Sequence, residues 1–182
     1  MGEKRPFVSA IVVAAGSASR MEGIDKQFAP VGGIPCLARA LLCFEECREI
    51  GEIVVVTREE SIAKVADLCA RWRLGKVSQI VRGGESRQQS AAIGRGPEGF
   101  IASPPDRATL FACQTPQIFE VEAYRRAMEE AFAQGRDYTD DCQLFESAGQ
   151  RVYLSQGSYD NIKITTPEDL ALCEQILAVR GE

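Results

Sequence analysis

The stretch VSAIVVAAGS, residues 8–17, decides the fold. Residues 8–15 are almost all apolar and rich in β-branched side chains, which is typical of a strand buried on both faces of a parallel sheet. The small residues at 16–19 then end the strand in a turn. We therefore expect a buried strand with a loop at its carboxyl end.

Strands and helices alternate through the rest of the first half. Further buried strands are predicted at 53–57 and 77–81. Apolar residues at helical spacing predict helices at 36–50 and 61–72. This alternation indicates an α/β fold with a mostly parallel sheet and right-handed crossovers.

The second half is less regular. Glycine and proline are frequent at 94–106, which predicts a loop or an extended arm. The last helix has the clearest start, with Thr166 as N-cap, Pro167 at the first helical position and Asp169 three residues after the cap. The other predicted elements are helices at 121–133 and 140–148, the second with Thr139 as N-cap, and short strands at 152–154 and 162–165.

Length and charge limit the possible functions. The 182 residues suggest one domain, and 21 Lys+Arg against 26 Asp+Glu give a net charge of −5, which argues against general nucleic-acid binding. The charged segment 1–6 does not resemble a signal peptide, and no apolar stretch approaches the roughly 20 residues of a membrane span. We expect a cytoplasmic protein without membrane or nucleic-acid partners.

The chain contains no histidine, which excludes Ser-His, Cys-His and His-metal mechanisms within one subunit. Its seven cysteines are an odd number without a C-x-x-C pair, which favours reduced thiols over a disulfide framework or a zinc site. Cys43 and Cys47 lie one helical turn apart. They are either packing residues or two ligands of a metal ion.

The loop after the first strand is the first candidate site. Ala14, Ala15 and Gly16 would let backbone N–H groups form a cradle for phosphate oxygens. Arg20 and Lys26 would add positive charge at the carboxyl end of a parallel strand, where open α/β sheets bind ligands. The alternative is a plain strand-to-helix connection with two solvated cations.

Three further segments carry polar residues in suggestive places, each with a structural alternative. Residues 83–87 with Ser90 suit close approach to a flat base, or form a turn and a helix cap at Ser86. Lys163, inside 160–165, is an edge-strand charge or an active-site cation. Residues 114–117 form a polar, rigid connection or a capped turn.

Taken together, five ordered motifs resemble the 2-C-methyl-D-erythritol 4-phosphate cytidylyltransferases of the non-mevalonate isoprenoid pathway. They are A-A-G-x-x-x-R-M-x(4)-K-Q-F at 14–28, G-G-x-S-R-x-x-S at 83–90, D-R-x-x-L-F-x-x-Q-T-P-Q at 106–117, Y-T-D-D at 138–141 and D-N-I-K-I-T-x-P-E-D-L at 160–170. The resemblance implies a Rossmann-like nucleotidyltransferase sandwich with an extended β-arm, around 96–109, that locks a homodimer. It also implies transfer of CMP from CTP, with Mg²⁺, to the methylerythritol phosphate, giving 4-diphosphocytidyl-2-C-methyl-D-erythritol and pyrophosphate.

The resemblance implies a role for each matching residue. Arg20 and Lys26 match the transition-state stabilisers, while Arg107 and Lys163 match the residues that position the acceptor phosphate, Arg107 acting in the partner's site. The expected substrate contacts are Ala14, Ala15 and Gly16 for the triphosphate and cytosine, Gly84, Glu85 and Ser90 for cytosine and ribose, and Thr115 and Thr139 for the acceptor. The metal ligands are not identified.

One departure from the family concerns the acceptor site. A β-α-β segment of about 40 residues, with the family's H-D-x-x-R-P motif, is missing near 93–97. Either the sequence omits a segment of the natural protein or the deletion is real. The alternatives to the leading function are a ribitol-5-phosphate cytidylyltransferase and, if the deletion is real, a non-catalytic CTP-binding relative.

Overall fold

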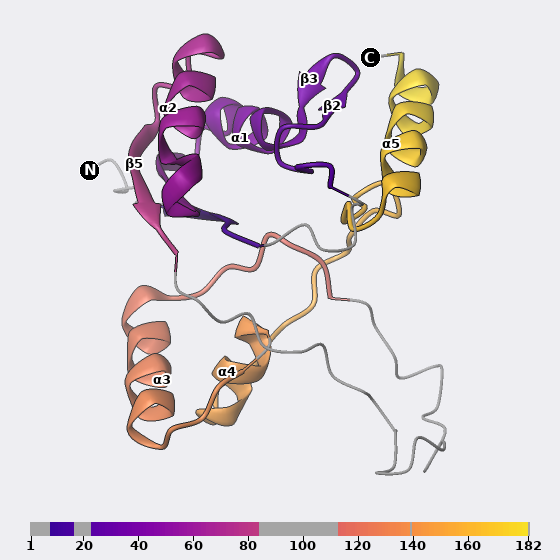
Figure 1. Ribbon diagram of the computed structural model, residues 1–182. Coiled ribbons are helices and arrows are strands. Elements are labelled where there is room, and N and C mark those ends of the chain that lie inside the picture. The colour runs from indigo at the N-terminus through magenta and orange to yellow at the C-terminus, as the bar shows by residue number, and fades with distance from the viewer. Residues whose placement is uncertain (1–7, 17–22, 84–112, 139, 182) are drawn as a thin grey trace, which may run out of the picture. The chain divides into compact units, whose positions relative to one another are not determined.

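The computed structural model describes residues 8–16, 23–83, 113–138 and 140–181. Contacts divide the chain into two compact units, drawn in Figure 1. We call Met1–Glu85 with Ile162–Glu182 the sheet unit, and Ser86–Asn161 the helical unit.

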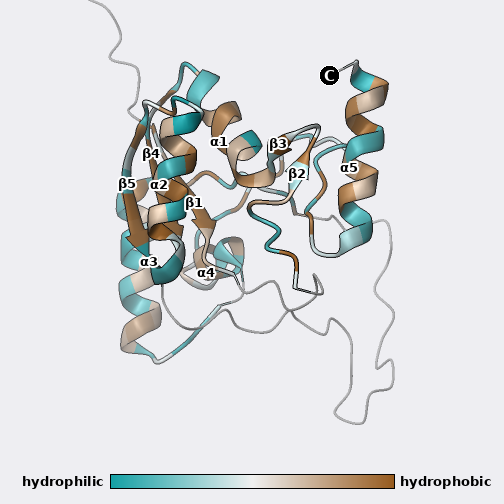
Figure 2. Cartoon of the chain, turned by 45° about the horizontal axis from the view of Figure 1, so that its top comes forward, coloured by the Kyte–Doolittle hydropathy of each residue, from teal (hydrophilic) through white to brown (hydrophobic). Residues whose placement is uncertain are grey.

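The sheet unit is built on a three-stranded parallel sheet in the order β1-β4-β5. The strands are β1 (Val8–Ala14), β4 (Ile50–Thr57) and β5 (Val77–Arg82). Apolar residues colour much of all three brown in Figure 2. The predicted parallel α/β sheet is confirmed.

Helices α1 (Cys36–Glu46) and α2 (Ile62–Arg71) build the core of this unit with the sheet. Figure 1 shows α2 beside β5. Leu41, Ile53, Val55 and Val65 are fully buried in this core. The alternation of side chains along a strand places Ile53 and Val55 on the same face of β4.

Two details of the sheet differ from the expectation. The strand at 8–15 is not buried on both faces, because Ile11 and Val13 are 67% and 59% exposed. The helix predicted at 36–50 ends at Glu46, because Ile50 already pairs with Val8 as the first residue of β4. The side chains of β1 therefore alternate between two faces of the sheet. Ala10, Val12 and Ala14 face the core, and Ile11 and Val13 do not.

A short hairpin that sequence reasoning missed precedes α1. It joins β2 (Pro30–Val31) to β3 (Ile34–Pro35) through Gly32 and Gly33, whose φ angles are +57° and +72°. Positive φ at both turn residues is the geometry that favours Gly-Gly in two-residue hairpins, so the sequence did contain a signal for it.

Helix α5 (Pro167–Arg180) is the last element of the sheet unit and contacts β2 (Figure 1). Its start at Thr166–Pro167, with a Thr166–Asp169 capping box, is confirmed. The side chain of Glu174 accepts a hydrogen bond from the Gly32 N–H at 2.6 Å. The short 3-10 helix η1 (Glu59–Ser61) leads from β4 into α2.

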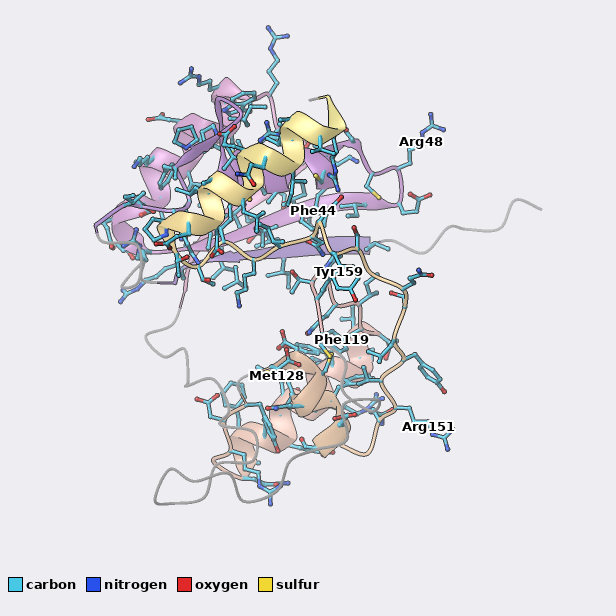
Figure 3. The ribbon with its side chains drawn as sticks, turned by 90° about the vertical axis from the view of Figure 1, so that its right-hand side faces the viewer. Phe44, Arg48, Phe119, Met128, Arg151 and Tyr159 are labelled. Carbon is cyan, nitrogen blue, oxygen red and sulfur yellow. The ribbon has the colours of Figure 1, made fainter. Side chains whose placement is uncertain are left out.

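The helical unit contains α3 (Val121–Ala133) and α4 (Asp141–Ser147). Ala127, Ala131 and Leu144 form its small core. Figure 3 labels Phe119 and Met128 in this unit. The ring centroids of Phe119 and Phe145 lie 5.1 Å apart, and the rings are tilted by 53° to each other.

Two expectations for the second half are wrong. The N-cap of α4 is Asp140 and not Thr139, because the Asp140 carboxylate accepts a hydrogen bond from the Cys142 N–H at 2.9 Å. Residues 152–154 and 162–165 are irregular rather than strands. A strand requires a hydrogen-bonded neighbour, and neither segment has one among the residues that the structure describes.

Candidate functional site

The carboxyl ends of the three parallel strands bring two candidate loops together. Ala14, at the end of β1, pairs in register with Thr57 of β4, and the Thr57 carbonyl accepts a hydrogen bond from the Gly83 N–H at 2.8 Å. A Cβ atom on Gly83 would lie only 2.7 Å from Cβ of Ala15. Glycine is therefore required at 83 for this close approach of the loops after β1 and β5.

The start of the first loop is fixed by hydrogen bonds to the backbone carbonyl of Ala14. The carbonyl oxygen of Ala14 accepts hydrogen bonds from Nε2 of Gln27 and, at 3.4 Å, from the hydroxyl of Thr57. Gln27 and Thr57 are both buried, at 7% and 0% exposed. Ala15 and Gly16, which follow, are half-buried, so their backbone lies near the surface at the strand end.

Lys26 joins this loop to the last predicted motif. Its Nζ donates a hydrogen bond to the carbonyl oxygen of Ile164 at 3.3 Å. The structure therefore brings Lys26 next to the segment that carries Lys163. Lys163 itself is exposed in an irregular segment, so the edge-strand interpretation of this residue is wrong.

Asp169 fixes the segment around Lys163 from the start of α5. Its Oδ2 accepts hydrogen bonds from the N–H groups of Thr165 and Thr166, at 2.7 and 2.9 Å, and from the Thr165 hydroxyl at 2.9 Å. These bonds favour the carboxylate and lower the pKa of Asp169 below its usual value. The helix start is thus also the anchor of the polypeptide that Lys26 contacts.

In the helical unit, the structure brings the Q-T-P-Q motif to the start of the D-N-I-K motif. Nδ2 of Asn161 donates to the carbonyl oxygen of Thr115 at 2.9 Å. Nε2 of Gln114 donates to the carbonyl of Ser158 at 2.7 Å, and Gln117 donates to the Asp140 carboxylate at 3.1 Å. The side chain of Thr115 is exposed.

Several predicted residues lie outside the described residues. They are Arg20, Gly84, Glu85, Ser90, Arg107 and Thr139, together with the arm expected at 96–109 and the break near 93–97. The predicted site residues that the structure describes are therefore Ala14, Ala15, Gly16, Lys26 and Lys163 in the sheet unit and, separately, Thr115 in the helical unit.

Sequence reasoning missed four residues that build the site. Gln27 and Thr57 hold the Ala14 carbonyl, and Asp25 pairs with Arg58 at 3.1 Å beside Lys26. Gln27 belongs to the K-Q-F motif, and Thr57 is a buried polar residue at the end of an apolar strand. Both features were signals of a polar contact at this place, because buried polar groups need hydrogen-bond partners.

No group of three or more His, Cys, Asp or Glu within the described residues could hold a metal ion. No described helix combines the length and the apolar composition that crossing a membrane requires.

Comparison with known proteins gives the chain its family. The family model of IspD, 2-C-methyl-D-erythritol 4-phosphate cytidylyltransferase, matches residues 8–95 and 90–179, two ranges that overlap at 90–95. Proteins named 2-C-methyl-D-erythritol 4-phosphate cytidylyltransferase are similar over 93% of this chain. The one from Clostridium botulinum strain ATCC 19397 is 34% identical over 221 positions, covering 96% of its length. The one from Dehalococcoides mccartyi is 31% identical over 220 positions, also covering 96% of its length.

Both alignments exceed the 182 residues of this chain, so these relatives carry residues with no counterpart here.

Solved structures show the same fold. The 4-diphosphocytidyl-2C-methyl-D-erythritol synthase of Anaerococcus prevotii matches with a TM-score of 0.75 at 22% identity, over 94% of this chain and 96% of that one. The 2-C-methyl-D-erythritol 4-phosphate cytidylyltransferase of Thermus thermophilus matches with a TM-score of 0.60 at 21% identity, over 93% and 98%. The parallel strand ends, the loop at Ala14–Gly16 and the Lys26 contact agree with the sequence motifs. On the family match and the curated relatives, the chain belongs to the IspD family of cytidylyltransferases.

Proposed function

We propose that this protein transfers CMP from CTP to 2-C-methyl-D-erythritol 4-phosphate, a step in the synthesis of isoprenoid precursors. The observation that carries the proposal is the position of Lys26. It lies between Asp25 and Gln27, which are bonded to the ends of β4 and β1, and its Nζ reaches the segment of Lys163. The family match adds the identity of the substrates.

In the proposed reaction, an oxygen of the acceptor phosphate attacks the α-phosphorus of CTP. A new P–O bond forms there, and the bond from the α-phosphorus to the bridging oxygen of the β-phosphate breaks. The bonding electrons leave with pyrophosphate. The attacking phosphate is already an anion, so the reaction requires no general base from a chain that has no histidine.

Fixed positive charge is the main contribution expected from this chain. Negative charge increases on the α-phosphoryl oxygens in the transition state, and preorganised cations stabilise it there. We assign this role to Lys26 with Arg20, and assign the placing of the acceptor phosphate to Lys163 with Arg107. The backbone N–H groups of the loop that begins at Ala14 would hold the triphosphate.

Mg²⁺ is proposed as the ion that accompanies CTP. This ion keeps several waters and is usually held by phosphates and one or two carboxylates rather than by an all-protein cage. The described residues offer no cluster of three or more acidic ligands, so no residue is assigned to the ion and no step depends on it.

The assembly and location belong to the same proposal. We propose a cytoplasmic homodimer in which residues around 96–109 form an arm that delivers Arg107 to the partner's site. We also propose one nucleotidyltransferase domain over 1–182 that lacks a family segment near 93–97. The match to the family model in two ranges, which overlap at 90–95, supports the second point.

Pyrophosphate release with CTP, Mg²⁺ and one of two acceptors tests the function. Methylerythritol phosphate should support turnover, and ribitol 5-phosphate should not. Turnover with ribitol 5-phosphate alone would reassign the acceptor on the same nucleotide site. Folded protein that binds CTP but releases no pyrophosphate with either acceptor would reject the enzymatic proposal.

A further inference from the structure

Lys26 lies in a short turn whose two neighbours are both fixed. The carbonyl of Asp25 accepts hydrogen bonds from the N–H groups of Phe28 and Ala29, each at 3.0 Å, which closes the turn around Lys26. The carbonyl of Gln27 accepts from the Leu37 N–H at 2.9 Å. The backbone at Lys26 is therefore held from both sides before any side chain is considered.

Side chains then connect this turn to two strand ends. Gln27, itself buried, donates to the Ala14 carbonyl at the end of β1. Asp25 receives Nη2 of Arg58 on its Oδ2 at 3.1 Å, and Arg58 is the residue directly after β4. Thr57, the last residue of β4, donates to the same Ala14 carbonyl. The turn is thus tied to the strands that carry the nucleotide loop.

The Asp25–Arg58 pair is only partly open to solvent. The side chains of Arg58 and Asp25 are 31% and 33% exposed. The pair is therefore less screened than the Arg125–Glu122 pair on α3, whose side chains are 64% and 54% exposed. Water and salt weaken the attraction between Asp25 and its neighbours less than they weaken that of a fully exposed pair.

Charge gives Arg58 a second effect beyond holding the turn. The Asp25 carboxylate directly precedes Lys26 in the chain, and an uncompensated carboxylate attracts an ammonium group and reduces the positive potential around it. The Arg58 guanidinium, which contacts Asp25 at 3.1 Å and also the more exposed Glu60 at 3.6 Å, offsets part of that negative charge. The positive potential around Lys26 is therefore higher than it would be beside an Asp25 carboxylate without this partner.

We propose that Arg58 and Asp25 are positioning residues, which tie the turn of Lys26 to the end of β4 and raise the positive potential that Lys26 presents to the phosphates of CTP. This inference rests on the proposed function. Neither side chain is assigned a contact with substrate, and both act through Lys26.

The kinetic test uses a single and a double variant. Arg58→Gln leaves the Asp25 carboxylate without its guanidinium partner, and we expect kcat to fall about tenfold, because the positive potential that stabilises the transition state at Lys26 is reduced. Adding Asp25→Asn removes that carboxylate, so Asp25→Asn/Arg58→Gln should recover most of the lost kcat. Arg125→Gln, which breaks the exposed pair on α3, is the control and should match the wild type.

The recovery separates the charge effect from simple bracing. If the pair only braced the turn, the double variant would be as slow as Arg58→Gln or slower, and this result would overturn the proposal. An unchanged kcat in Arg58→Gln would overturn it as well. The temperature of unfolding is measured for each variant, so that a folding defect is recognised.

A second readout does not depend on activity. Acetic anhydride acetylates neutral amines, so its rate at Lys26, followed by peptide mass spectrometry, reports how strongly nearby charges hold the proton. Arg58→Gln should slow acetylation of Lys26 and Asp25→Asn should accelerate it. Equal rates in both variants and the wild type would refute the inference. If the wild type released no pyrophosphate, the proposed function would fail, and this labelling would still decide the role of the pair.

Discussion

Lys26 is the described side chain on which the proposed chemistry most directly depends. Its Nζ contacts the Ile164 carbonyl, and its neighbours in sequence are bonded to the ends of β1 and β4. A lysine on a flexible loop would lose conformational freedom when it bound a phosphate, and this lysine has already lost part of it. The fixed turn therefore makes Lys26 a preorganised cation rather than a mobile one.

The first prediction concerns Lys26→Gln. Removing this charge should lower kcat by on the order of 10²–10³, as loss of other preorganised electrostatic groups does. Steady-state pyrophosphate release at saturating CTP measures the effect. Arg48→Gln is the control, because Arg48 is exposed and points away from the chain in Figure 3. Near-normal kcat in Lys26→Gln would remove this residue from the mechanism.

At this scale the sequence singled out Lys26 and Lys163 as candidate cations and gave no role to the residues that hold the turn of Lys26 in place. Lys26 and Lys163 stand out because they belong to ordered motifs. Arg58 lies 33 residues from Asp25, and Gln27 lies 13 from Ala14, so the spacing along the chain gives no hint that they meet. Such contacts depend on how two strand ends lie in the sheet, which only the folded structure shows.

At the scale of the elements, helices and strands bring distant motifs to the same place. The start of α5 anchors the Lys163 segment through Asp169, and the parallel strands bring the loops after β1 and β5 into contact. The helices at 121–133 and 167–179 and the strand at 77–81 were predictable, because each has a strong apolar period or a clear cap. The prediction of strands at 152–154 and 162–165 was wrong, because a local sequence pattern cannot reveal whether a neighbouring strand exists.

The second prediction concerns the pH dependence of Asp169→Asn. The folded state lowers the pKa of Asp169, so its carboxylate stabilises the fold above the unfolded pKa, about 4, and this contribution is lost as the pH falls through the folded value. The variant should be less stable than the wild type at pH 7, and the difference should shrink below about pH 4. Urea unfolding at several pH values measures both.

Asp67→Asn provides the comparison at pH 7, since Asp67 is exposed on α2 and makes the same change of charge. A difference between wild type and Asp169→Asn that stayed constant down to pH 2 would show that the carboxylate charge does not stabilise the start of α5.

The third prediction concerns the core of the sheet unit. Leu41 is fully buried between α1 and the sheet, so Leu41→Ala should lower the free energy of unfolding by about 2–5 kcal/mol. Leu172→Ala, at a side chain that is 45% exposed on α5, should change it by less than about 1 kcal/mol. Chemical denaturation of both variants measures the difference, and equal losses would contradict the described packing of α1.

At the scale of the whole molecule, the proposed difference from the family is the segment near 93–97. The relatives align over more positions than this chain has residues, and the family model matches in two ranges. A parallel sheet that lost a strand would expose an unpaired edge of backbone N–H and C=O groups. The family and the parallel sheet could be recognised from the sequence, whereas the arm and the dimer depend on residues outside the described part.

The fourth prediction concerns the intact mass of the natural protein. If a family segment of about 40 residues is omitted from this sequence, the mass should exceed the 19.9 kDa of the chain by several kilodaltons. Mass spectrometry of the protein isolated from its natural source measures it. A mass of 19.9 kDa would establish a real deletion and place the acceptor site in doubt.

The most direct test of the central claim is ³¹P NMR of the protein mixed with CTP, Mg²⁺ and 2-C-methyl-D-erythritol 4-phosphate. The account predicts that the triphosphate and phosphomonoester signals disappear together, while two coupled signals of a diphosphate diester and the signal of pyrophosphate appear in equal amounts. Unchanged CTP and acceptor signals, in protein shown to be folded, would contradict it.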